Sequence, residues 1–153
     1  MTMALTQLQL PAFQARTRQH NGALQIFDTF RRRYVVLTPE EWVRQHLAHF
    51  LVNFRGFPSG RLAVEREIRQ HGFRRRYDLV AFSADMQPLL LGECKAPGVA
   101  LSEETLQQIR AYHQSIPAPY LLISNGLQHF CCKLNPTRQS WDFLADIPHF
   151  EAL

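Results

Sequence analysis

Residues 76–95 read RYDLVAFSADMQPLLLGECK and contain two apolar runs separated by a polar segment. Arg76–Phe82 and Leu89–Lys95 are short and mostly apolar, which is typical of strands inside a sheet. The polar segment Ser83–Pro88 between them predicts a turn. A turn of this length joins antiparallel neighbours, so we place the centre of a β-sheet here.

The sequence on both sides adds elements to this centre. Apolar residues alternate over 62–68 and are followed by Gln70-His71-Gly72, which predicts another antiparallel strand and a turn. Downstream, Ser102 can cap a helix that runs to about Gln114. The remaining predicted segments are strands at Tyr120–Ser124 and His129–Leu134 and an aromatic tail, residues 141–150, that packs back on the domain.

The first helix has a well-defined predicted start. Thr38 is a good N-cap, Pro39 takes the first helical position, and Glu41 completes a capping box. Apolar residues then recur at three- and four-residue spacing as far as Phe54. Before this helix, Leu24–Leu37 is predicted to form a hairpin. The expected class is therefore α/β: a mixed central sheet flanked by helices, with an N-terminal hairpin.

Length and composition limit the remaining possibilities. A chain of 153 residues is long enough for one domain, which we expect at 24–153 after an N-terminal arm (1–23) that is loosely attached or forms a short helix. The formal net charge is +4 and the isoelectric point is near 9.3, which suits a polyanionic partner. No run approaches the roughly 18 apolar residues of a membrane span, so no membrane partner is expected. Three cysteines make a disulfide framework improbable and favour a reducing, cytoplasmic location.

Charged residues at the ends of the two central strands carry the chemical signal. Glu93 and Lys95 alternate with Cys94, so their side chains share one face of the strand while Cys94 points to the other. The turn that follows the preceding strand can bring Asp78 close to Glu93. Two carboxylates beside a lysine form an oxygen-rich pocket that suits Mg²⁺ or Mn²⁺. A surface ion pair at the strand ends is the simpler alternative.

In order and spacing, Asp78 and Glu93-Cys94-Lys95 resemble the PD-(D/E)xK nuclease signature. Residues 108–112, QIRAY, resemble the Q-x-x-x-Y motif of one branch of that superfamily. Within this branch, the phrases RRRYVVLTPEEWVRQH, LLLGECKAP and APYLLISNGLQHFCCKL resemble the N-terminal nuclease domain of type I restriction enzyme R subunits, in its short stand-alone form. The resemblance covers Leu24 to the C-terminus and implies a restriction-endonuclease-like fold.

The resemblance also implies roles for individual residues. Asp78 and Glu93 would bind the metal, together with the backbone carbonyl of Cys94. Lys95 would be the catalytic lysine. Gln108 and Tyr112 would brace the site or contact the DNA strand, since they lie four apart on one helical face.

An acidic residue from an earlier element often completes such sites. Glu65 in the first strand of the sheet and Glu41 in the first helix are the two candidates. A second explanation exists for Glu41, because the capping box requires a glutamate there.

Two runs of arginine and four histidines are further candidates for a functional role. Arg31-Arg32-Arg33 and Arg74-Arg75-Arg76 would bind phosphates on either side of the scissile bond, or would be solvated turns. The histidines lack the spacing of a zinc site, and we expect structural or surface roles for His46, His49, His113 and His129.

The predicted function is metal-dependent endonucleolytic cutting of DNA. R subunits continue into a motor, but these 153 residues contain no G-x-x-x-x-G-K-[ST] motif, so we expect no nucleotide cofactor. The chain would cut without a motor or together with a motor or specificity subunit, as a monomer or a homodimer. The alternative function is a non-catalytic nucleic-acid-binding or accessory subunit that keeps the nuclease fold.

Overall fold

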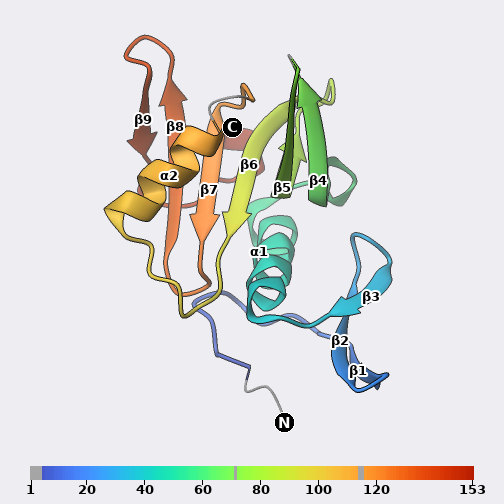
Figure 1. Cartoon of the computed structure of the whole chain (residues 1–153). Helices are drawn as coiled ribbons and strands as arrows, with labels where there is room; N and C mark the ends of the chain where they lie inside the picture. The colour runs from blue at the N-terminus through green and yellow to red at the C-terminus, as the bar shows by residue number, and fades with distance from the viewer. Residues whose placement is uncertain (1–4, 71, 114–115) are drawn as a thin grey trace.

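The computed structural model describes residues 5–70, 72–113 and 116–153, and contains two sheets (Figure 1). The smaller sheet is antiparallel, in the order β1 (Thr17–His20), β2 (Ala23–Asp28) and β3 (Arg33–Val36). The larger has six strands in chain order: β4 (Leu62–Gln70), β5 (Phe73–Phe82), β6 (Pro88–Cys94), β7 (Tyr120–Ser124), β8 (His129–Asn135) and β9 (Ser140–Phe143). Short 3-10 turns occupy Ser59–Arg61 and Phe150–Ala152.

The larger sheet is mixed, as its sequence predicts. Strands β4, β5 and β6 are antiparallel neighbours, whereas β6 and β7 are parallel and are joined through helix α2 (Glu103–His113). The strands from β7 to β9 are antiparallel again. This topology confirms the predicted α/β class with a mixed central sheet and an N-terminal hairpin.

Helix α1 (Pro39–Arg55) begins and ends where its local sequence predicts. The Thr38 hydroxyl accepts a hydrogen bond from the Glu41 backbone N–H at 3.0 Å, which forms half of the capping box. Gly56 then adopts a left-handed conformation with φ 70°, which a glycine tolerates without steric cost, and ends the helix.

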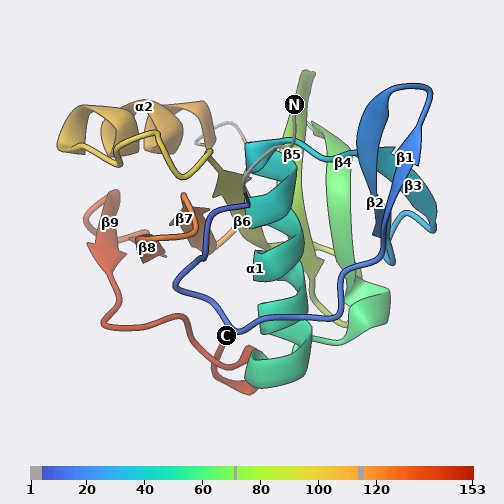
Figure 2. The same cartoon turned by 90° about the horizontal axis from the view of Figure 1, so that it is seen from below.

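The two helices cover opposite faces of the larger sheet (Figure 2). Successive residues of β5 alternate between the two cores: Leu79 and Ala81 pack toward α1, whereas Val80 and Phe82 pack toward α2. The core under α1 includes Val43, Leu47, Leu51, Leu90 and Cys94. The core under α2 includes Leu91, Leu106, Ile109, Leu121 and Ile123. In the described part of the chain, neither helix is long and apolar enough to cross a membrane.

The ends of the chain differ from expectation. Within the predicted arm, Thr17–His20 forms strand β1 rather than a helix. Residues 8 and 9 are attached to the domain, because Leu8 is buried and the Gln9 N–H donates to the Gly126 carbonyl at 2.8 Å. The C-terminal tail packs back as predicted, but residues 140–143 also add β9 to the sheet. The predicted turn residue His71 and helix end Gln114 lie outside the described residues.

Candidate functional site

The site lies where β5 and β6 separate. Their ladder of paired residues extends as far as Leu79 and Gly92. One residue beyond it, the Asp78 carboxylate accepts a hydrogen bond from the Cys94 backbone N–H at 2.7 Å. The side chain of Asp78 thus lies against the backbone between Glu93 and Lys95, as the turn between the strands predicts.

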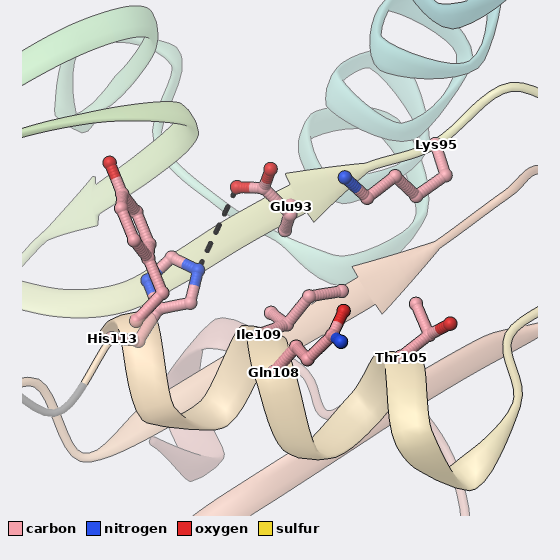
Figure 3. A pocket seen from close by; sticks show the side chains of 7 residues that line it. Glu93, Lys95, Thr105, Gln108, Ile109 and His113 are labelled. Carbon is pink, nitrogen blue, oxygen red and sulfur yellow. Dashed lines mark ion pairs between the residues drawn. The ribbon is translucent and has the colours of Figure 1, made fainter.

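Glu93 and Lys95 line a cavity of about 240 Å³ between the end of β6 and helix α2 (Figure 3). Cys94 points away from it, into the core under α1, which confirms the predicted alternation. Helix α2 supplies the rest of the lining: Thr105, Gln108, Ile109, Tyr112 and His113. Four of the five residues predicted to be catalytic therefore meet at one cavity, and Asp78, which does not line it, is bonded to the Cys94 backbone between Glu93 and Lys95.

A buried arginine holds a set of carboxylates next to this cavity. The side chain of Arg44, from α1, is only 7% exposed. It pairs with Asp78 at 3.0 Å and with Glu65 at 2.7 Å. It also pairs with Glu40 at 3.1 Å and with Glu41. One cation therefore joins carboxylates from α1, β4 and β5.

Glu40 connects this cluster electrostatically to the cavity. Burial raises its pKa above the ordinary 4.5, and the negative charges of Asp78 and Glu93 raise it further, against the lowering effects of Arg44 and Lys95. Glu40 was not predicted as a site residue. Both acids lie in the first turn of α1, and only Glu41 occupies the capping-box position, so the sequence gives no separate signal for Glu40.

The two acids proposed to complete the site are both held by arginines. Glu41 is 5% exposed and bonds to Arg31 at 2.6 Å as well as to Arg44, on the side of α1 that faces the smaller sheet. Glu65 pairs with Arg76 at 2.7 Å and shares Arg44 with Asp78. Glu65 and Asp78 pair with the same Arg44 nitrogen, Nη2, whereas Glu41 pairs with Nη1.

The two basic runs differ in how they are exposed. Arg31 turns inward to Asp28 and Glu41 and is 17% exposed, whereas Arg32 and Arg33 face solvent. In the second run, Arg74 and Arg76 are 66% and 64% exposed, and each pairs with a glutamate of β4. Arg75 lies over the Tyr112 ring, with its guanidinium carbon 5.1 Å from the ring centre.

The donor set fits a hard divalent cation in its chemistry. Carboxylate oxygens from Asp78, Glu93 and Glu40 and the Cys94 carbonyl are the kind of ligand that Mg²⁺ prefers. Within the described segments, however, no three His, Cys, Asp or Glu side chains converge on a point that could hold a metal. At Asp78, one carboxylate oxygen is paired with Arg44 and the other accepts a hydrogen bond from the Cys94 N–H.

Comparison with known proteins gives one family. The profile described as type I restriction enzyme R protein N terminus (HSDR_N) matches residues 39–148. That range begins at α1 and includes the acidic cluster, the cavity and the six-stranded sheet. No curated protein matches the chain.

Proposed function

This chain belongs to the type I restriction enzyme R protein N-terminal family, and we propose that it hydrolyses phosphodiester bonds of DNA with the help of a divalent metal. The observation that carries the proposal is the meeting of Glu93, Lys95, Gln108 and Tyr112 at one cavity. Asp78 lies beside it, on the Cys94 backbone.

Each residue has a role that its position supports. Asp78, Glu93 and the Cys94 carbonyl would hold Mg²⁺ or Mn²⁺, with Glu65 or Glu40 as the additional acid. When bound, such an ion neutralises phosphate charge and lowers the pKa of a water molecule. Lys95 lies on the same face as Glu93 and orients the attacking water or stabilises the charge that grows on the phosphate.

Charge and family support DNA as the substrate. Arg74 and Arg76 expose most of their side chains on β5, the strand that carries Asp78, and would bind the DNA backbone next to the scissile bond. Other subunits of a restriction system, a motor or a specificity subunit, are the proposed partners.

Plasmid cutting tests the proposal. Purified protein is incubated with supercoiled DNA and Mg²⁺, Mn²⁺ or EDTA, beside the variants Asp78→Ala and Lys95→Ala. The matched control is Lys133→Ala, because Lys133 is exposed on β8 and does not line the cavity. Nicking that needs metal, persists in Lys133→Ala and disappears in the other two variants is the expected result. Normal cutting by Lys95→Ala would refute the assignment.

A second function is favoured by one observation. Both oxygens of Asp78 already have partners, which suits a domain that binds DNA and does not cut it. Such a domain would shift the mobility of a DNA duplex equally in Mg²⁺ and EDTA and leave the duplex intact. Metal-dependent cutting excludes this alternative.

A further inference from the structure

His113 ends helix α2 and lies beside the proposed metal ligand Glu93. The residue is 1% exposed, and it lines the same cavity as Glu93 and Lys95. Its Nε2 atom is 3.7 Å from the nearer Glu93 oxygen, and Figure 3 shows the ring facing that carboxylate. Within the described part of the chain, neither ring nitrogen has a hydrogen-bond partner.

Two tyrosines fix the orientation of this ring. It stacks on Tyr77, which is fully buried, with 4.7 Å between ring centres and 27° between planes. The Tyr112 ring meets its edge at 90°. The imidazole is therefore held with Nε2 toward Glu93 by packing that does not involve its nitrogens.

Packing alone gives no reason for an imidazole at this position. A phenyl ring would make the same stacking contacts without burying polar atoms. A buried polar atom without a partner is unfavourable, because it has lost its hydrogen bonds to water, and such atoms in native proteins call for an explanation. The group that Nε2 faces is a carboxylate, which is a strong acceptor for a ring N–H.

We propose that His113 is a positioning residue that donates its Nε2–H to Glu93 and holds this carboxylate in the orientation that binds the divalent cation. The inference rests on the proposed function. The 3.7 Å separation exceeds the upper end of an ordinary N–H···O hydrogen bond, about 3.2 Å, by only about half an ångström. Groups that orient a metal-binding side chain in this way change metal affinity roughly 10–100-fold when they are removed.

Two substitutions separate positioning from packing. His113→Phe keeps an aromatic ring against Tyr77 but removes the donor. His113→Gln places an amide N–H near the position of Nε2 and loses the ring. The matched control is His46→Phe, since His46 is also buried, at 5% exposure, and bonds instead to the Trp42 carbonyl of α1.

Calorimetric titration of the folded proteins with Mn²⁺ is the measurement, with circular dichroism as the check on folding. The expected result is at least about tenfold weaker binding for His113→Phe, recovery of most of the affinity in His113→Gln, and no change in His46→Phe. Equal affinity of His113→Phe and the wild type overturns the inference, and so does His113→Gln binding no better than His113→Phe.

Failure of the proposed function gives a different result. A folded wild type that binds no Mn²⁺ would refute the metal-dependent function and this inference together. Wild-type binding that neither His113 substitution changes would refute the role of His113 alone. Cutting of plasmid at varied Mg²⁺ provides a second readout, in which His113→Phe should need more metal for half-maximal rate.

Discussion

Arg44 is the residue on which the acidic cluster depends. Its side chain is almost fully buried, and its guanidinium is shared among Glu40, Glu41, Glu65 and Asp78. Removing one partner of a buried ion pair leaves uncompensated charge, which costs about 3–5 kcal/mol. Arg44→Met should therefore lower the free energy of unfolding by about that amount, measured by urea denaturation at neutral pH.

The matched control for Arg44 is an arginine in an exposed pair. Arg69 pairs with Glu67 at 2.7 Å but has 69% of its side chain exposed. Exposed pairs contribute about 0–1 kcal/mol, so Arg69→Met should unfold nearly as the wild type does. Equal losses in the two variants would show that the Arg44 cluster contributes no more than a surface pair.

Glu40 predicts a pH-dependent effect on stability. Burial and the charge of Asp78 raise its pKa above 4.5, so the folded chain holds this proton more tightly than the unfolded chain does. The resulting stabilisation is complete below about pH 4.5 and is lost as the pH rises through the folded pKa. Glutamine imitates the protonated acid at every pH.

Glu40→Gln should therefore be more stable than the wild type at neutral pH. Its advantage should shrink as the pH falls toward 4.5, the pKa that an unfolded glutamate has. Urea denaturation at a series of pH values gives the difference directly. An advantage that is constant with pH, or that grows on acidification, would contradict the assigned cause.

At the scale of elements, the pairing of β5 with β6 sets the position of both proposed carboxylate ligands. Gly92 faces Leu79 so closely that a Cβ atom at residue 92 would lie 2.8 Å from the Leu79 Cβ. Gly92→Ala should force the strands apart next to Asp78 and Glu93 and cost about 1–3 kcal/mol, the usual penalty for overpacking.

Gly98→Ala is the control for this strand pair. A Cβ at residue 98, in the loop that follows β6, would meet no atom within 4 Å. Thermal unfolding of the two variants should show a lower midpoint for Gly92→Ala only. Two unchanged midpoints would mean that the sheet adjusts at Gly92 without strain.

The elements also show which features the sequence can predict. Helix α1 could be placed because Thr38, Pro39 and Gly56 act locally, through caps and backbone preference. Strand β1 was missed because all four of its residues are exposed, so no alternation of apolar and polar residues marks it. Strand β9 is short, lies at the edge of the sheet, and depends on pairing with β8 for its structure.

The same distinction applies to the site. Strand alternation puts Glu93 and Lys95 on one face, and helical spacing does the same for Gln108 and Tyr112. The resemblance to the nuclease family then predicted that the two pairs belong to one site, and the structure brings all four to one cavity. Arg44 and His113 could not be predicted, since a lone arginine or histidine on a helix usually faces solvent or fills a core. Their roles depend on contacts between elements that are distant in the chain.

For the whole molecule, the reactivity of three buried thiols can show whether the sheet unfolds in one step. Cys94 on β6 and Cys131 and Cys132 on β8 are free and at most 3% exposed. Burial raises the pKa of Cys131 to about 12 and that of Cys132 to about 11, and it raises the pKa of Cys94 well above its ordinary value. Since the thiolate is the reactive form, all three should be inert in the folded chain.

Reaction with an excess of a thiol reagent at pH 8 tests whether β6 and β8 belong to one cooperative unit. No labelling is expected without denaturant. All three thiols should react once the chain unfolds, and the denaturant concentration at half-labelling should equal the midpoint of the unfolding transition measured by circular dichroism. Early labelling of Cys94 alone would reveal local opening of the β6 end, which carries the proposed site. That result would contradict a rigid site and would mean that Glu93 and Lys95 are brought into place only when metal or DNA binds.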